Sequence, residues 1–301
     1  MIGLAGSAAT NILTVRVITA LGSDPSAEDP LLAVFNDGGL PVSCTQAAPL
    51  ALSLAAGSTM GVPANTPFNL WVGWFYDAGV SRLALINTRN GSSVCSISAA
   101  RASALAEGGG AADEAQKFFA SAAISDKPFI VVGKLEWDAG LTTAGQWTTP
   151  SRVIAYYPGM KLPCDVVQVA TTSTATQANN ASSTYADAGP SVSLAPQSAA
   201  NLVTLLATGP IGIVATAAGR RASARISRGG TVIGKTAQFY AAAAGTVILP
   251  ANMMALDAPG TRSSCTWGVQ IASSGGDLVT WANSGFDGAS GASISAAEIA
   301  V

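Results

Sequence analysis

The stretch from Phe68 to Ile97, FNLWVGWFYDAGVSRLALINTRNGSSVCSI, decides the fold class. It begins with FNLWVGWFY, a dense apolar run rich in residues that favour strands, and we expect Trp71 and Trp74 to be core residues. The tripeptide DAG then separates this run from VSRLALIN, which is a hairpin signature. The dipeptide NG at 90–91 is the strongest two-residue turn signal, and it leads into SVCSI. The stretch therefore predicts a three-stranded meander.

Alternation of apolar and polar residues extends from this meander toward both ends of the chain. In LTVRVITAL, Leu13, Val15 and Val17 face one way and the residues between them face the other. Further strands are expected in KPFIVVGKLEW, SRVIAYY, RASARIS, TVIGK, GTVILP, SCTWGVQIAS, GDLVTWANS and ASISAAEIAV, with TWGVQIASSGGDLVTWA forming a hairpin. The one helix-like stretch follows Ile97, where the glycines at 108–110 allow at most a short helix from Ser98 to Leu105.

The segment from Thr172 to Leu206 has the composition of a linker, because its only charge is Asp187. It nevertheless contains strands: VVQVATTSTATQA begins before it, and SVSLAP alternates within it, after a turn at YADAG. The apolar segment 202–219 is interrupted by Gly209-Pro210, which favours two strands and a turn over a membrane helix. We therefore expect this half of the chain to be folded.

These patterns predict an all-β protein of two domains, each a β-sandwich or jelly roll. The clearest boundary is YYPGMKLPCDVVQ, where prolines and a glycine separate two sets of strands. We place the N-terminal domain at residues 1–163 and the C-terminal domain at residues 164–301. The domains are expected to pack or intertwine as a homotrimer, for the reasons that follow.

The charge content of the chain bears on its partners. Charged residues make up 11% of the 301 residues, against about 25% in an average soluble domain. So neutral a surface favours association of subunits, although Ser, Thr, Gly and Ala also make neutral soluble surfaces. The net charge is −2, and Arg220-Arg221 is the only basic cluster. Nucleic acid and membrane insertion are therefore not expected.

The residue types exclude several kinds of chemistry. The chain has no histidine, which excludes a Ser-His-Asp or Cys-His centre and a histidine-ligated metal site. We expect no catalytic residue, no cofactor and no metal. The four cysteines are widely spaced and are interpreted as buried free thiols, with Cys44–Cys95 and Cys164–Cys265 bridges as the alternative in an oxidising compartment. Glu136 and Asp138 lie two apart on a strand, which suits either a glycosidase pair or two carboxylates capping a turn.

One segment, LEWDAGLTTAGQWTTPSRVIAYYPGMKLPCDVVQV, resembles a stretch of bacteriophage tail-fibre and receptor-binding proteins. That family has E-W, then G-L-x-T-A-G-x-W, and then x-x-P-G-x-x-x-P-G-x-V-V-Q. The matching positions here are Glu136, Trp137, Gly140, Leu141, Thr143, Ala144, Gly145, Trp147, Pro158, Gly159, Pro163, Val166, Val167 and Gln168. Cys164 stands where the family usually has glycine.

The resemblance extends over nearly the whole chain. STYADAGPSVSLAPQSAANLVTLL is similar to the family's Y-x-D-x-G-x-x-x-x-I-x-P-x-S-x-x-S-K-I-L segment without its lysine, RISRGG to its L-x-R-G-S-T-x-I hairpin, and SISAAEI to its terminal M-E-I strand. SDPSAEDPLLAVF and LAEGGGAADEAQKFF are similar to its N-terminal module.

The resemblance implies a non-enzymatic virion protein of the distal tail, assembled in the host cytoplasm. Such a protein is a homotrimer, contacts other phage tail proteins, and recognises a bacterial surface receptor that is a polysaccharide, a pilus or an outer-membrane protein. Two alternatives stay open: a tail spike that cleaves polysaccharide, and a collar or connector component of the virion.

Two aromatic side chains near the loops of the last predicted hairpin, Trp281 and Phe286, are our candidates for contacts with the receptor. Flat aromatic rings suit stacking against sugar faces. The alternative is that both pack in the core or along the axis of a trimer.

Overall fold

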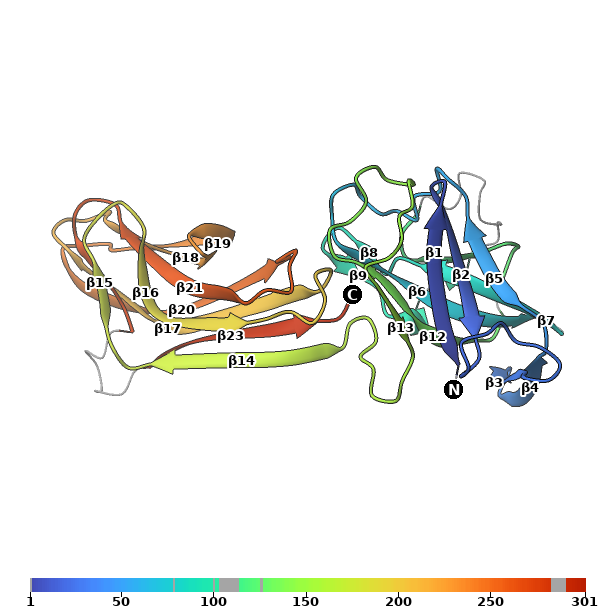
Figure 1. Ribbon diagram of the computed structural model, residues 1–301. Coiled ribbons are helices and arrows are strands. Elements are labelled where there is room, and N and C mark those ends of the chain that lie inside the picture. The colour runs from blue at the N-terminus through green and yellow to red at the C-terminus, as the bar shows by residue number, and fades with distance from the viewer. Residues whose placement is uncertain (1, 78, 100, 103–113, 125–126, 283–290) are drawn as a thin grey trace. The chain divides into compact units, whose positions relative to one another are not determined.

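The computed structural model describes residues 2–77, 79–99, 101–102, 114–124, 127–282 and 291–301 (Figure 1). Within these ranges the chain is almost entirely β-strand, with one 3-10 helix, η1 (Ile97–Ala99). The predicted all-β fold class is confirmed. No helix among the described residues is both long and apolar enough to cross a membrane.

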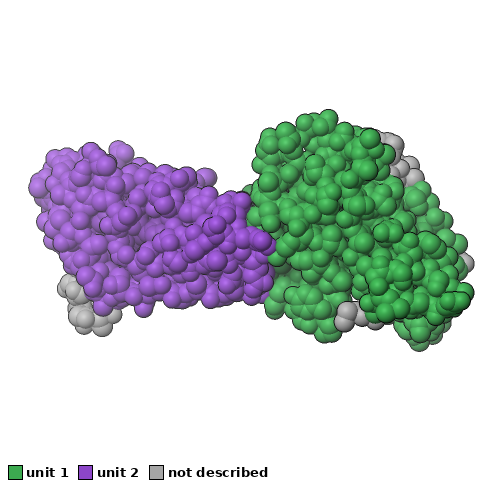
Figure 2. All heavy atoms as spheres, in the orientation of Figure 1, with its two compact units in different colours: residues 1–165, 198–200, 300–301 green, residues 166–197, 201–299 purple. Residues whose placement is uncertain are grey.

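The chain divides into two compact units, which Figure 2 shows in green and purple. Unit 1 contains residues 1–165, 198–200 and 300–301, and unit 2 contains residues 166–197 and 201–299. The first change of unit lies two residues beyond the boundary placed at 163. The last segment belongs to unit 1 because the backbone carbonyl of Val301 accepts hydrogen bonds from Asn69 Nδ2 (2.8 Å) and Trp71 Nε1 (3.1 Å).

Unit 1 is built on a six-stranded sheet whose order is β10-β11-β7-β6-β12-β13, accompanied by a three-stranded sheet, β1-β2-β5, and two hairpins, β3-β4 and β8-β9. The strands are β1 (Gly3–Ala9), β2 (Ile12–Ile18), β3 (Leu31–Asp37), β4 (Leu40–Gln46), β5 (Leu50–Leu54), β6 (Phe68–Asp77), β7 (Val80–Ile86), β8 (Arg89–Asn90), β9 (Ser93–Val94), β10 (Arg101–Ala102), β11 (Lys117–Ala120), β12 (Phe129–Trp137) and β13 (Arg152–Ala155).

The central strand β6 is buried on both faces, as its unbroken apolar run requires. Leu70, Val72 and Trp74 face the core that the six-stranded sheet shares with β1, β2 and β5. Trp71 and Phe75 face a second, smaller core on the other side of the sheet. The alternation predicted for β2 is confirmed, because Leu13, Val15 and Val17 are all fully buried.

Two expectations for unit 1 were wrong. The hairpin β6-β7 forms, but the expected third strand of the meander is only the two-residue β9, which pairs with β8 and leaves the edge of β7 to β11. Likewise, the described start of the expected helix, from Ser98 to Leu105, is the end of η1 followed by β10. Parallel pairing of Arg101 with Lys117 satisfies the backbone there. Residues 103–105 lie outside the described residues.

Unit 2 consists of two sheets packed face to face. The larger has the order β14-β23-β17-β22-β15, with β20 on the other edge of β17, and the smaller has the order β16-β21-β18-β19. The strands are β14 (Val166–Thr174), β15 (Ala178–Asn180), β16 (Ala186–Leu194), β17 (Leu202–Ala215), β18 (Arg221–Arg228), β19 (Thr231–Tyr240), β20 (Gly245–Asp257), β21 (Cys265–Ser273), β22 (Leu278–Trp281) and β23 (Ala292–Ile299).

The inward faces of the two sheets form one core of small aliphatic residues and two tryptophans. Ala222, Ala224 and Ile226 point inward from β18, and Val192 and Leu194 from β16, as their alternation predicts. The serine- and threonine-rich segment 172–206 is folded, as expected, because it contains the end of β14, all of β15 and β16, and the start of β17.

Gly209-Pro210 was expected to separate two strands, and instead lies within the single strand β17. One edge of β17 pairs with β23 up to Thr208 and with β22 from Ile211 onward. The proline, which has no N–H to donate, therefore lies at the gap between two partner strands.

Two turns of the C-terminal half were also misassigned. The expected hairpin of β21 and β22 does not form, because β21 pairs in the smaller sheet and β22 in the larger one. The expected turn at 185–189 is the start of β16. A bulge lies between Asp187 and Ser191 there, and Gly189 has a positive φ of 93°.

Candidate functional site

The structure describes one of the two aromatic residues predicted to contact a receptor, Trp281, and not the other, Phe286. Trp281 ends β22 with its side chain fully buried in the core of unit 2. A Cβ added to Gly189 would come within 2.7 Å of its ring, so that glycine leaves the space the indole fills. The position matches the packing alternative, because the buried ring offers no surface to a receptor. Phe286 lies outside the described residues.

The carboxylate pair Glu136 and Asp138 does not lie in an open groove. Glu136 is 1% exposed, with Oε1 2.8 Å from Lys134 Nζ and Oε2 paired with Arg152. The backbone N–H of Asp138 donates to Ser151 Oγ at 3.1 Å. These contacts connect β12 to the chain around β13, so the local chemistry is that of an ion-pair network.

The described residues hold no group of three or more His, Cys, Asp or Glu side chains placed to bind a metal ion. All four cysteines are free: Cys44 is buried, Cys95 and Cys265 are half-buried, and Cys164 is exposed. The absence of disulfides agrees with the interpretation as free thiols, but only Cys44 is buried, as such thiols were expected to be.

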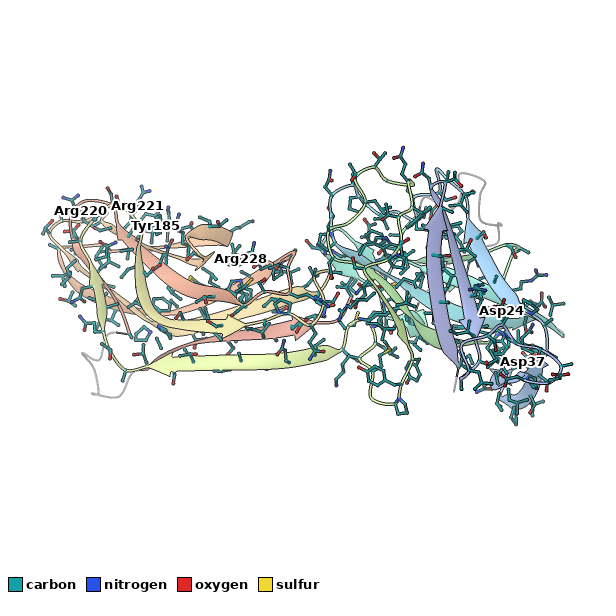
Figure 3. The ribbon with its side chains drawn as sticks, viewed as in Figure 1. Asp24, Asp37, Tyr185, Arg220, Arg221 and Arg228 are labelled. Carbon is teal, nitrogen blue, oxygen red and sulfur yellow. The ribbon has the colours of Figure 1, made fainter. Side chains whose placement is uncertain are left out.

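Unit 2 has a polar outer face on its smaller sheet, which we call the arginine–tyrosine face. It is defined by residues of β16, β18, β19 and β21 and by the residue before β16, namely Tyr185, Asp187, Arg221, Ser223, Arg225, Gln238, Tyr240 and Gln270. Figure 3 labels Tyr185 and Arg221 toward one end of unit 2 and Arg228 further along it.

A chain of contacts crosses this face from strand to strand. Gln270 Nε2 donates to Asp187 Oδ1 at 2.9 Å, and Arg225 Nε donates to Gln270 Oε1 at 3.0 Å. The guanidinium of Arg225 lies over the ring of Tyr185, with its Cζ 3.7 Å from the ring centroid. The register explains the alignment, because Gln270 pairs with Asp187 on one side and with Arg225 on the other.

The four arginines on β18 and directly before it fall into two groups. Arg220 Nε lies 3.2 Å from Asp277 Oδ2, and Arg228 Nη1 lies 3.1 Å from Asp257 Oδ2. By contrast, among the residues that the structure describes, Arg221 and Arg225 form no ion pair. Arg221 lies over the ring of Tyr240, 5.0 Å from its centroid.

Hydrogen bonds from Thr216, through its side chain and its backbone N–H, hold the pKa of Asp277 below its usual range. Burial acts in the opposite direction, and Arg220 adds a smaller lowering effect. The backbone N–H of Thr216 donates to Asp277 Oδ1 at 2.8 Å. Arg220 is therefore matched to an ionised partner, unlike the neighbouring Arg221.

The larger sheet has a second outer face, which we call the uncharged face. Its outward positions on β14, β23, β17 and β20 are Val169, Thr171, Ser173, Ser293, Ser295, Ala297, Thr204, Leu206, Thr208, Asn252, Met254 and Leu256. Met254 is 75% exposed and Val169 62% exposed. The only charged residues on these four strands, Glu298 and Asp257, point inward and are buried.

Glu298, fully buried in unit 2, joins segments that are far apart in the sequence. It accepts hydrogen bonds from Gln168 Nε2 (2.6 Å), Asn201 Nδ2 (2.6 Å) and the backbone N–H of Gln197 (2.7 Å). Gln168 is the glutamine of the V-V-Q motif and Glu298 belongs to the terminal E-I motif. Gln197 and Asn201 lie in the segment that resembles P-x-S-x-x-S, Gln197 at its first variable position and Asn201 where the family has serine. Three separate motifs therefore meet at one carboxylate.

A second set of motif residues meets in unit 1. The ring of Trp137 stacks on Phe68 at 4.7 Å between centroids and lies 5.8 Å from Trp147. Gly140 and Gly145 adopt positive φ values of 74° and 77° close to the backbone of other residues. Cys164 has a φ of 75°, the left-handed conformation that glycine adopts most readily.

No family model matches the chain, and no curated protein matches it. A solved structure of infectious bursal disease virus, Gx strain, is similar over 100% of this chain and 76% of that chain, with 13% identity and a TM-score of 0.27. The VP2 subviral particle of infectious bursal disease virus is similar over 99% of this chain and 72% of that chain, with 9% identity and a TM-score of 0.29. At these values the likeness carries no conclusion about function.

Proposed function

We propose that this chain is a virion protein of a bacteriophage tail fibre that attaches the particle to the bacterial surface by binding, without catalysis. The observation that supports this most is the convergence at Glu298. Gln168 and Glu298 match separate tail-fibre motifs in the sequence, Asn201 lies within a third similar segment where the family has serine, and Glu298 accepts hydrogen bonds from both. Residues matched by chance to three short motifs have no reason to meet in this way.

The backbone at Cys164 adds independent support. The family usually has glycine at this position, and Cys164 adopts the left-handed conformation that favours glycine. An alignment shifted by one residue would place the family's glycine on Asp165 or Pro163 instead. The match between motif and backbone therefore supports the register of the resemblance.

The surroundings of the carboxylates support binding of a surface receptor rather than cleavage of a polysaccharide. A glycosidase needs two carboxyl groups facing a bound sugar, about 5–9.5 Å apart. Glu136 is instead covered and paired with Lys134 and Arg152. The polysaccharide-cleaving spike stays the alternative, together with a collar or connector component.

Copies of the chain, three in the tail-fibre family, are proposed to associate through the uncharged face. A surface without charge is complementary to another surface without charge, and a second copy supplies one. The strands β14, β23, β17 and β20 have 9, 8, 14 and 13 residues. At about 3.3 Å per residue and about 4.8 Å between strands, they cover about 700 Å². A stable interface buries about 600–1,000 Å² per partner, so the area is sufficient.

The attachment function is tested by incubating purified full-length protein with the host bacteria of particles that contain it. Saturable binding, and competition with those particles for adsorption, are expected. Immunogold labelling of intact particles should mark the distal tail. Labelling of the capsid or collar would favour the connector, and release of fragments from host polysaccharide would favour the spike.

Self-association is tested by the native mass in solution. The wild-type chain is expected at three times its 29.9 kDa. Met254→Asp places a charge on the uncharged face and should lower the mass to that of one chain. Ser193→Asp adds the same charge to an exposed position of β16 on the other sheet and should leave the mass unchanged. A single-chain mass for the wild type would overturn this part of the proposal.

A further inference from the structure

Two arginines of the arginine–tyrosine face have positive charges that no described carboxylate neutralises. Arg225 and Arg221 both lie outward on β18, and neither forms an ion pair within the described part of the chain. Asp187 is the acidic side chain of this face, and its Oδ1 already accepts a hydrogen bond from Gln270. The other arginines of this region, Arg220 and Arg228, each pair with a buried aspartate.

Both guanidinium groups lie over tyrosine rings. Arg225 lies 3.7 Å from the centroid of Tyr185 and is also fixed through Nε by Gln270. Arg221 lies 5.0 Å from the centroid of Tyr240. A guanidinium carries five N–H donors, and its two Nη groups match the two oxygens of a carboxylate or phosphate. The face therefore presents two pre-positioned donors for anions.

The surroundings of the two arginines indicate which anionic ligand fits. Ser223 lies between them on β18, and Gln238 pairs with it in register on β19, so hydroxyl and amide groups fill the intervening surface. Tyrosine and arginine also anchor protein interfaces, where they become fully buried in pockets of the partner. Here the exposed aromatic ring, Tyr240, is already in contact with Arg221. A ligand rich in hydroxyl groups, with acidic groups at intervals, matches these side chains best.

We propose that the arginine–tyrosine face binds an acidic saccharide, whose carboxylate or phosphate groups are held by Arg221 and Arg225. The inference rests on the proposed attachment function, which it deepens by naming the class of receptor. The two arginines are four positions apart on one strand, so their Cα atoms lie about 13 Å apart. A polymer with repeated acidic groups engages both at once, which raises its apparent affinity.

The test is calorimetric titration of the full-length protein with oligogalacturonate, a phosphorylated mannan oligosaccharide and neutral dextran oligosaccharide. At least one acidic probe is expected to bind, more weakly at high salt, and dextran is not. The two acidic probes distinguish carboxylate from phosphate. Failure of both to bind would overturn the inference.

Variants locate the binding. Arg221→Gln and Arg225→Gln should each weaken binding about tenfold, the effect of losing one hydrogen bond to a charged group. Arg225→Lys keeps the charge but lacks the planar fork, and should also weaken binding. Arg262→Gln removes the same charge from an exposed loop before β21 and should leave binding unchanged. An equal loss in Arg262→Gln would show that only the net charge matters, which overturns the inference.

A cell-binding experiment distinguishes failure of this inference from failure of the proposed function. An Arg221→Gln, Arg225→Gln double variant is expected to lose cell binding while its circular dichroism spectrum stays that of the wild type. If the double variant binds cells as the wild type does, the assigned face is wrong and the attachment function stands. If the wild type itself fails to bind cells, the attachment function fails, and the titration still decides whether the face takes acidic saccharides.

Discussion

Each of the two units buries a glutamate, and they stabilise it in different ways. In unit 1, Glu136 is 1% exposed and is paired with Lys134 and Arg152. In unit 2, Glu298 is fully buried and is held by two side-chain amides and one backbone N–H. Burying a carboxylate requires charge pairing or several hydrogen bonds, and the two glutamates use one solution each. Glu136 thus depends on opposite charge and Glu298 on neutral donors.

The hydrophobic cores of the two units also differ, in the kind of side chain that fills them. The ring–ring contacts found among the described residues all belong to unit 1. They form three groups: Phe68 with Trp137 and Trp147, Phe75 with Phe118 and Phe129, and Phe35 with Trp74 and Tyr76. The core of unit 2 is mostly alanine, valine and isoleucine. Unit 1 therefore has its stability concentrated in large buried rings, and unit 2 in small aliphatic side chains.

The largest expected effect tests the aromatic core of unit 1. Trp147→Ala removes a side chain that is 2% exposed and contacts both Phe68 and Trp137. The cavity should lower the free energy of unfolding of unit 1 by about 3–5 kcal/mol. Hydrogen exchange measured by mass spectrometry should show faster exchange in peptides of unit 1 and little change in those of unit 2.

Tyr157→Ala is the matched control, because this aromatic side chain of unit 1 is 55% exposed. Its removal should change stability by less than about 0.5 kcal/mol. If the two variants lose similar stability, or if exchange rises equally in both units, then the stability of unit 1 is not concentrated in its buried rings.

The next effect contrasts the two glutamates. Glu298→Gln replaces one acceptor oxygen by a donor facing Gln168, whose Nε2 also donates to the carbonyl of Ala195 at 2.7 Å and cannot turn away without losing that bond. A cost of about 2–3 kcal/mol is expected, the penalty for buried donors left without an acceptor. Chemical denaturation measures it.

Glu136→Gln should cost less, about 1–2 kcal/mol, since the side chain of Arg152 is 36% exposed and can be solvated. Salt then separates the two mechanisms. In 1 M NaCl the cost of Glu136→Gln should shrink, because salt screens partly exposed charges. The cost of Glu298→Gln should not change, because its partners are neutral. If the costs of the two substitutions depended equally on salt, the distinction between the two glutamates would be contradicted.

Much of this fold follows from short-range patterns. The alternation of Leu13, Val15 and Val17 and that of Ala222, Ala224 and Ile226 predict the buried faces of β2 and β18. Pairing between distant strands does not follow from such patterns. Nothing local in GDLVTW shows that β22 leaves the sheet of β21, and nothing near Gly209-Pro210 shows that β17 changes partner there. Those outcomes depend on strands tens of residues away.

The candidate site was even less accessible from sequence. Trp281 attracted the prediction of a receptor contact because aromatic residues suit interfaces, yet the alternation of Val279 and Trp281 around Thr280 already indicated an inward position. The arginine–tyrosine face was missed because Tyr185 and Asp187 were interpreted as a turn. The bulge in β16 and the pairing through Gln270 bring them beside Arg225, and neither is encoded within a single segment.

Acid should affect unit 2 through Asp277. Hydrogen bonds from Thr216 lower the pKa of Asp277 in the folded protein below the usual value of an aspartate. A carboxyl group with a lowered folded pKa stabilises the protein above its unfolded pKa, and this contribution is lost as the pH falls through the folded value. Stability should therefore fall from about pH 4 downward. Asp277→Asn should make stability depend less on pH in this range. Thermal unfolding between pH 2 and 6 measures this, and an unchanged slope of melting temperature against pH would contradict the role of Asp277.

The smallest effect concerns the backbone of Cys164. Glycine there should relieve the left-handed strain of a side-chain-bearing residue, about 1–2 kcal/mol, and should lose about 0.5–1 kcal/mol through the freer unfolded chain. Cys164→Gly should also lose a weak contact from Sγ to the Val94 carbonyl at 3.5 Å, so a gain in stability below about 1 kcal/mol is expected.

Cys164→Val should instead lower stability by about 1 kcal/mol or more, because a β-branched residue is disfavoured at a positive φ. The melting temperatures of the two variants should therefore lie on opposite sides of the wild type. If valine is tolerated as well as glycine, the left-handed geometry is not imposed at this position, and the register of the tail-fibre resemblance loses the support it takes from Cys164.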